Sequence, residues 1–237
     1  WDIQNILTIL RGKVQGLSEG KIRAVLVPAG ELDVAMLDSR LTETSVERIV
    51  ETLPEKQMSA ILSAGLSEAL ETHSFGKLEN ELYKYYYATL IKAARGGMKS
   101  GLPFLKYVMF EIDIKNITTL FRIRAQGKPD ENTSDIWIVG GSYQADELER
   151  ICSVESLDEV VDTLKKKIKS PVLIEALESL REKKPIYAIE GMLIAAHLNQ
   201  MDNVSKRNPF SISPLLVYLE RKKYEVTNLR ALARGKE

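Results

Sequence analysis

The sequence has very few residues that bind metals or form covalent cross-links: one cysteine and two histidines among 237 residues. Cys152 has no second thiol with which to form an internal disulfide or a thiolate zinc site. His73 and His197 lie far apart in the sequence and do not form a local metal-binding pair. We therefore expect no metal site, no cofactor and no catalytic residue in this chain.

Net charge and long apolar runs are also absent. Lys and Arg together number 33, as do Asp and Glu, so no long-range field favours a nucleic acid partner. No run reaches the roughly 18 apolar residues that a membrane span needs. None of the Gly-Lys pairs belongs to a Gly-x-x-x-x-Gly-Lys-Ser/Thr phosphate loop. We expect a globular protein that is cytoplasmic or peripheral to a membrane.

The sequence does contain an internal repeat. A motif of an acid, a β-branched residue, any residue and then Asn occurs three times, ending at Asn5, Asn116 and Asn228. The spacings are 116 − 5 = 111 and 228 − 116 = 112 residues. Six residues after each Asn stands an arginine: Arg11, Arg122 and Arg234. Eight residues after each Asn stands a Lys or an Arg.

The similarity continues between the motifs without a gap. At an offset of 111 the first copy matches the second at Gly30 and Gly141, Leu37 and Leu148, Ser45 and Ser156, Leu66 and Leu177, and Glu79 and Glu190. One register held over about eighty residues indicates a duplication. The chain therefore divides into a first repeat unit at 1–108, a second at 109–220 and the start of a third at 221–237.

Each repeat unit has the pattern of a set of helices. After each Asn, apolar residues at +1, +4 and +5 form one helical stripe. Short helices are predicted at 32–37, 45–53 and 156–164, and long ones at 77–95 and 186–198. Apolar helices at 103–110 and 214–222 lead into the second and third motifs. The runs 25–30 and 136–141 are extended pieces or turns, so the predicted class is all-α.

These motifs resemble a known family. Asn-Ile-x-Thr-Ile-Leu-Arg-Gly-Lys at 5–13, Glu-Ile-Asp-Ile-Lys-Asn at 111–116 and Tyr-Glu-Val-Thr-Asn-Leu-Arg-Ala-Leu-Ala-Arg-Gly-Lys at 224–236 are similar to the C subunit of archaeal-type (A-type) rotary ATPases, which corresponds to the d subunit of V-type ATPases. The resemblance implies a funnel of helices with three lobes related by pseudo-three-fold symmetry. Part of one lobe is expected to be missing from this chain.

The resemblance also implies a function. Such a protein is not an enzyme: it couples the rotating shaft of the central stalk to the proteolipid ring of the membrane during ATP synthesis or hydrolysis. The implied partners are the shaft subunits and the ring, with one copy in the complex, on the cytoplasmic side of the membrane.

The repeated polar residues have two interpretations. Asn5, Asn116 and Asn228 can satisfy backbone groups at a joint between helices, with Arg11, Arg122 and Arg234 paired to nearby carboxylates, or the same residues can contact a partner. Two other functions remain open. One is a helical-repeat scaffold for soluble proteins, and the other is an enzyme whose paired carboxylates Glu79 and Glu190 hold a metal.

Overall fold

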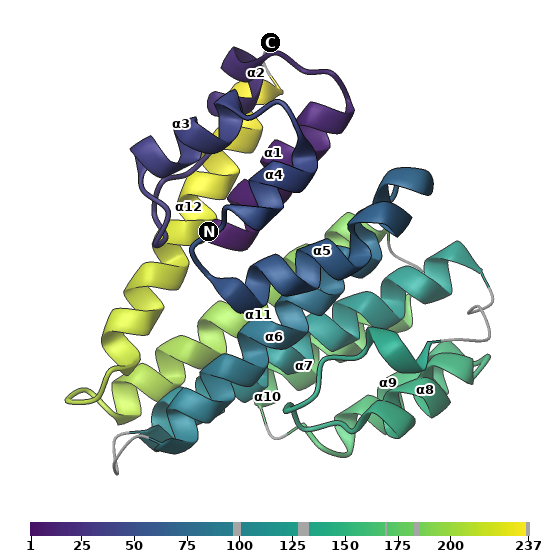
Figure 1. The fold of residues 1–237 in the computed structure, drawn as a ribbon. Coiled ribbons are helices and arrows are strands. Elements are labelled where there is room, and N and C mark those ends of the chain that lie inside the picture. The colour runs from purple at the N-terminus through teal and green to yellow at the C-terminus, as the bar shows by residue number, and fades with distance from the viewer. Residues whose placement is uncertain (97–100, 128–132, 169, 183–184, 236–237) are drawn as a thin grey trace. The chain divides into compact units, whose positions relative to one another are not determined.

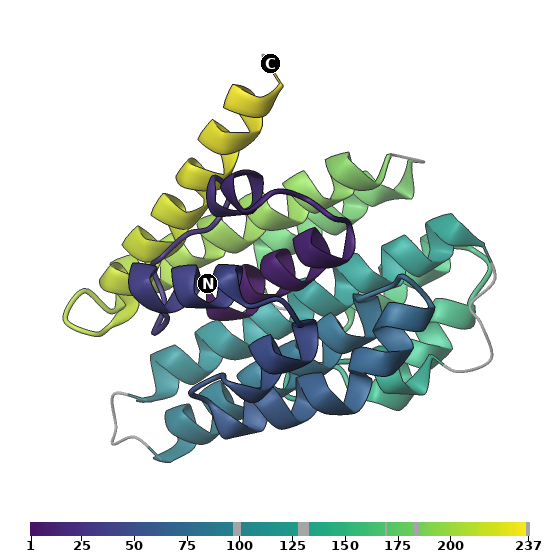
Figure 2. The same ribbon diagram turned by 45° about the horizontal axis from the view of Figure 1, so that its top comes forward.

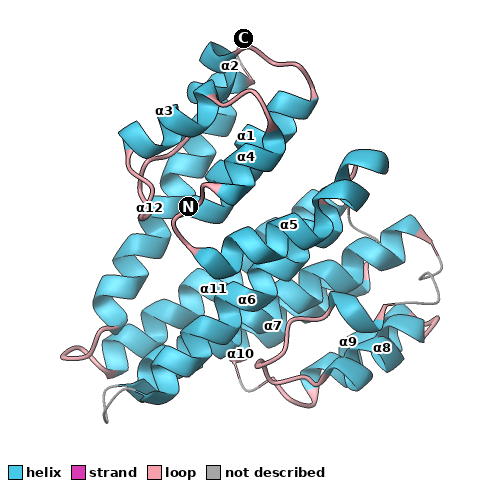
Figure 3. Ribbon diagram, viewed as in Figure 1, coloured by secondary structure: helices cyan, strands magenta, loops and turns pink. Residues whose placement is uncertain are grey.

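The computed structural model describes residues 1–96, 101–127, 133–168, 170–182 and 185–235. Within these ranges every regular element is a helix (Figures 1 and 3), which confirms the predicted all-α class. The chain divides into two compact units, unit 1 from Trp1 to Tyr86 and unit 2 from Tyr87 to Glu237. These compact units are a different division from the repeat units, because helix α6 (Gly76–Gly96) runs from unit 1 into unit 2.

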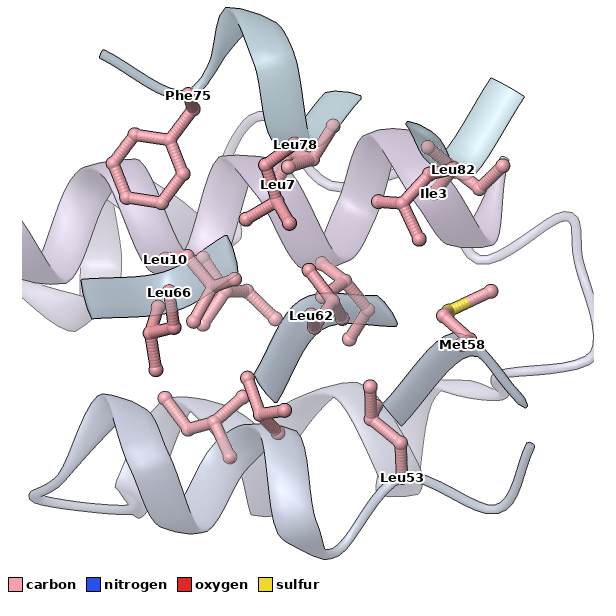
Figure 4. Packing of buried hydrophobic residues seen from close by; sticks show 14 of the residues in the cluster. Ile3, Leu7, Leu10, Leu53, Met58, Leu62, Leu66, Phe75, Leu78 and Leu82 are labelled. Atoms are coloured by element: carbon pink, nitrogen blue, oxygen red, sulfur yellow. The ribbon is translucent and has the colours of Figure 1, made fainter. Parts of the chain in front are cut away.

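Unit 1 is a bundle of short helices around the first Asn motif. Its elements are α1 (Asp2–Val14), α2 (Glu19–Arg23), α3 (Val34–Thr42), α4 (Val46–Glu51), α5 (Lys56–Glu71) and the first part of α6. Figure 4 shows side chains of α1, α5 and α6 meeting in its core, with Leu10, Leu62 and Leu82 among them. These three residues have no exposed surface. Complete burial of a leucine side chain contributes about 1.5–3 kcal/mol to folding.

Unit 2 begins in α6 and holds the second Asn motif. Its further elements are α7 (Gly101–Gln126), η1 (Ser134–Ile136), α8 (Ala145–Ser153), α9 (Leu157–Lys165), α10 (Pro171–Glu178), η2 (Ser179–Arg181), α11 (Ile186–Arg207) and α12 (Ser213–Arg234). Helix α11 packs against α7, α10 and α12. Figure 2 shows α12 turning back from the end of α11 and diverging from it.

The two cores use equivalent positions. The buried residues Ile6, Ile9, Leu37, Ile49, Val50, Leu62, Leu66 and Leu82 of unit 1 correspond, 111 residues later, to the buried Ile117, Leu120, Leu148, Val160, Val161, Leu173, Leu177 and Leu193 of unit 2. Because burial removes apolar side chains from water at matched places, each unit folds around the same pattern. The repeat-unit boundaries themselves stay a prediction.

The predicted elements agree with the helices at most places. The Ser45 hydroxyl accepts from the backbone N–H of Arg48 at 3.3 Å, and the Ser156 hydroxyl accepts from that of Glu159 at 3.4 Å. These contacts satisfy free amides at the starts of α4 and α9, as N-cap serines do. Helices α2, α5, α8 and α10 are additional to the elements that the sequence pattern predicts. Among the described residues, no helix combines the length and apolar character of a membrane span.

Candidate functional site

The Asn of the motif joins its helix to the turn that follows it. In unit 1 the Asn5 amide donates to the Val27 carbonyl at 2.8 Å, and its oxygen accepts from the Val27 N–H at 2.9 Å. In unit 2 Asn116 makes the same pair of bonds with Ile138, at 2.9 Å and 3.0 Å. Both contacts span 22 residues. A side-chain amide that satisfies one donor and one acceptor of a non-helical residue removes two unpaired buried groups.

The acid of the motif holds the same turn from a second point. Asp2 accepts from the backbone N–H of Glu31 at 2.8 Å and of Leu32 at 3.2 Å. Asp113 accepts from the N–H and the hydroxyl of Ser142, both at 2.7 Å. Asp2 lies in the first turn of α1, whereas Asp113 lies well inside α7, which already includes the lead-in segment.

The turn has a glycine in each unit, because the acid approaches the turn backbone closely. A Cβ atom on Gly30 would collide with the carboxylate of Asp2, and one on Gly141 would collide with that of Asp113. The equivalent glycines therefore let the turn backbone reach the acid, which a larger residue would prevent. Burial raises the pKa of Asp113 to about 6, although the hydrogen bonds from Ser142 oppose this shift.

The arginine six residues after the Asn pairs with a glutamate on the long helix of its unit. Arg11 Nη2 lies 2.6 Å from Oε2 of Glu79 on α6, and Arg122 Nε lies 2.6 Å from Oε1 of Glu190 on α11. Both pairs span 68 residues. All four side chains remain 27–56% exposed, so each pair contributes only about 0.2–1 kcal/mol. Their value lies in fixing the long helix against the motif helix.

Glu79 and Glu190 thus each have an arginine partner within their own unit. The structure does not bring the two glutamates together in one described unit. Among the described residues, no group of three or more His, Cys, Asp or Glu side chains is arranged to hold a metal. The geometry gives no support to the paired-carboxylate enzyme.

The basic residue eight positions after the Asn has a role that the sequence pattern does not assign. Lys13 Nζ donates to the carbonyl of Leu41, at the end of α3, and at 2.7 Å to that of Glu43. Arg124 donates to the carbonyls of Cys152, at 3.3 Å, and Val154 at the end of α8. These acceptors are again 111 residues apart. A cation at the last carbonyls of a helix caps it and complements its dipole. The triplicated basic position is the sequence signal for this cap.

The third copy of the motif differs from the first two. Asn228 is exposed on α12. Leu229 is 59% exposed and Leu232 is 64% exposed, whereas Ile6 and Ile117 at the position of Leu229 are fully buried. Arg234 ends α12, and its side chain lies outside the described part of the structure. The joint is therefore described twice, and the third copy presents its apolar stripe at the surface.

Comparison with known proteins gives one consistent result. The family model described as ATP synthase (C/AC39) subunit matches residues 1–237. The chain is 31% identical over 237 residues to the A-type ATP synthase C subunit of Methanocaldococcus jannaschii, covering all of this chain and 59% of that relative. It is 33% identical over 244 residues to that of Archaeoglobus fulgidus, covering 65% of the relative.

The chain thus spans less than two thirds of the length of these two relatives, and 68% of the equivalent protein of Halobacterium salinarum, to which it is 31% identical. The predicted family is confirmed, as is the expectation that the chain is not a catalytic subunit. The repeated joint, the all-helical units and the match over every residue lead to one assignment. The chain belongs to the ATP synthase (C/AC39) subunit family.

Proposed function

We propose that the chain is a non-catalytic adaptor of the central stalk in a rotary ATPase, and that it couples the rotating shaft to the proteolipid ring in the membrane. The observation that carries this proposal is the family match over residues 1–237. The relatives are named as C subunits of A-type ATP synthases, so their complexes make ATP. A position peripheral to the membrane, on its cytoplasmic side, belongs to the same proposal.

The repeated joints suit a part that transmits torque. Each described unit has a close-packed core, and such interiors deform little under strain. In each unit the motif helix is bonded to the turn, to the long helix and to the end of a short helix, through Asn, Arg and the +8 cation. A body built this way passes a rotation on without covalent chemistry.

The motif residues have different proposed roles in the three copies of the repeat. We assign Asn5, Asn116, Arg11 and Arg122 to joints within the first two repeat units. The segment 221–237 begins the third unit of a pseudo-three-fold funnel. For its copy of the motif, with Asn228 and Arg234, we propose contact with a partner.

The alternative is a helical-repeat scaffold that binds soluble proteins and neither shaft nor ring. The exposed apolar stripe of α12 would serve a scaffold equally well as a binding surface for a soluble protein. The repeat length argues against it, since helical scaffold repeats are usually about 20–45 residues long, whereas this repeat spans 111.

Binding to purified shaft subunits tests the proposal. The full-length protein should co-elute with the shaft in a 1:1 ratio and give a measurable heat of binding in calorimetry. Arg234→Glu should weaken binding at least tenfold, which is about 1.4 kcal/mol. Any loss of binding in the joint variant Arg122→Glu should be reversed in the double variant Arg122→Glu/Glu190→Arg, because exchanging the two charges restores the ion pair.

A folded parent that binds neither shaft nor ring would overturn the adaptor and favour the scaffold. A binding defect in Arg122→Glu that persists in the reversed pair would move Arg122 from the joint to the partner surface. Circular dichroism of each variant separates loss of binding from loss of folding.

A further inference from the structure

Three ionisable side chains meet where α12 packs on the rest of unit 2, two of them nearly buried and the third, Lys223, 35% exposed. Glu111 comes from α7, and Glu220 and Lys223 come from α12. The glutamate side chains are 13% and 11% exposed. Lys223 Nζ lies 3.2 Å from both carboxylate oxygens of Glu220 and 3.8 Å from Oε1 of Glu111. We call these three residues the α12 latch.

The surroundings of the latch are aromatic and mostly apolar. The Tyr107 hydroxyl donates to Oε1 of Glu220 at 3.0 Å. His197 of α11 stacks on Phe110 at 5.4 Å between ring centroids and lies 5.9 Å from Tyr107. The other charged or titratable groups facing the latch are Lys115 on α7 and Tyr224 on α12. The two carboxylates of the latch therefore lie in a mostly apolar helix junction, and the lysine reaches them from its partly exposed edge.

The latch has more negative than positive charge. Two carboxylates share one ammonium, and the buried Oε2 of Glu111 has no hydrogen-bond partner in the structure. Burial raises the pKa of Glu111, with the lysine opposing that shift. Such a cluster adds little net stability, because removing the charges from water costs about as much as their attraction returns. The latch therefore contributes something other than net stability.

The place of the latch on α12 indicates that contribution. Ser213, Val217 and Glu220 form one buried face of the helix at spacings of four and three. Beyond Lys223 the helix is largely exposed, with Val226 at 37% and Leu229 at 59%. The latch thus lies where α12 leaves the bundle. Apolar contacts are non-directional and tolerate several helix positions. Two polar contacts that cross from α7 to α12, Lys223 with Glu111 at 3.8 Å and Tyr107 with Glu220 at 3.0 Å, depend on the position of α12.

We propose that the α12 latch fixes the angle and register at which α12 leaves unit 2, and so aims the third copy of the motif, without adding net stability. Glu111 and Lys223 are five residues before their respective motif Asn residues. The latch therefore joins consecutive copies of the repeat through equivalent positions. This inference holds whether or not the chain couples a shaft to a ring.

Spin labels on the full chain test the latch. With Cys152→Ala as background, labels at Asn199→Cys on α11 and Thr227→Cys on α12 report the spread of interhelix distances by double electron–electron resonance. The parent should give one narrow distribution. The triple variant Glu111→Met/Glu220→Met/Lys223→Met keeps similar side-chain volume, and it should melt at or above the parent temperature while its distances broaden into several populations.

A reversed pair serves as the matched control. Glu111→Lys alone should broaden the distribution, and Glu111→Lys/Lys223→Glu should narrow it again, because the charges are the same in number and opposite in place. A triple variant with one narrow distance at the parent value would overturn the proposal. A triple variant that melts well below the parent, or unfolds, would also overturn it, since the latch would then supply stability.

Discussion

Asn116 and Ile138 are both buried, and they exchange two hydrogen bonds between a side-chain amide and a backbone N–H and C=O. The same exchange joins Asn5 to Val27 in unit 1. Because the acceptor and donor sit in a turn with no helical partners, the asparagine is the turn's hydrogen-bond partner. This arrangement leads directly to a first prediction.

Asn116→Ala should destabilise unit 2 strongly. It leaves the N–H and the C=O of Ile138 unpaired in a buried site, and each such group costs about 1–3 kcal/mol. Urea unfolding followed by circular dichroism should show a loss of at least about 2 kcal/mol. The matched control is Asn228→Ala, whose exposed side chain should change stability by less than about 0.5 kcal/mol. Equal losses in the two variants would refute the joint.

Gly141→Ala should also destabilise the fold, since the added methyl group would displace the Asp113 carboxylate from the turn. Overpacking of this kind typically costs about 1–3 kcal/mol. Gly20 on α2 has open space around its Cα, so Gly20→Ala should be neutral or stabilise by up to about 1 kcal/mol. Thermal melts of both variants check the contrast, and a tolerated alanine at 141 would contradict the described contact.

The contribution of Asp113 to stability should fall as pH rises from about 4 to about 6. Its pKa is 3.8 in the unfolded chain and about 6 in the folded one, so folding favours the protonated acid. Burial of Asp113 therefore does not reduce the free energy of unfolding below about pH 4, and it reduces it progressively between about pH 4 and pH 6. The loss is about 1.4 kcal/mol for each unit by which the pKa differs between the folded and the unfolded chain. Asp113→Asn should remove this dependence.

The measurement for Asp113 is the difference in unfolding free energy between the parent and Asp113→Asn at pH 4, 5, 6 and 7. The variant should gain on the parent as pH rises. A constant difference over that range would mean that Asp113 keeps its ordinary pKa and that its burial is offset by the bonds from Ser142.

His197 should make the fold sensitive to acid. Burial lowers its pKa from 6.5 to about 4, because the charged ring would be desolvated. Its contribution to stability is therefore complete above pH 6.5 and is lost as pH falls toward about 4. His197→Phe keeps a ring beside Phe110 and removes two ring nitrogens that have no hydrogen-bond partner, so it should raise stability by about 1 kcal/mol at pH 7 and more at pH 5.

The control for His197 is His73→Asn. His73 is exposed and has a backbone φ of 52°, a conformation that Asn tolerates better than most residues. This variant should leave the acid sensitivity unchanged. If the His197→Phe variant still loses stability as the pH falls, groups other than His197 cause that loss.

Much of the architecture could be predicted because the sequence is repeated. The offset of 111 links Glu79 to Glu190 without knowledge of any contact, and both pair with the arginine six residues after an Asn. The helical stripe after each Asn predicts the buried Ile6 and Ile117. Helical periodicity and the duplication are enough to predict these matched positions, and no knowledge of the tertiary structure is needed.

Other features depend on tertiary contacts that periodicity does not show. The acceptors of Lys13 are at the end of a different helix, and no local pattern around Lys13 names them. The contact of Asp113 with Ser142 joins residues 29 apart, and no local pattern around Asp113 indicates it. The near-complete burial of Glu111 and Glu220 is also hidden, since charged residues are normally found at the surface.

The measurement that tests the central claim most directly is ion pumping by a rotary ATPase lacking its own C subunit, rebuilt in vesicles with and without the full-length protein. We predict that adding the protein restores ATP-driven ion uptake, while the protein alone hydrolyses no ATP. A complex that takes up the protein stoichiometrically yet hydrolyses ATP without pumping, or a purified protein that itself turns over ATP, would contradict a coupling role.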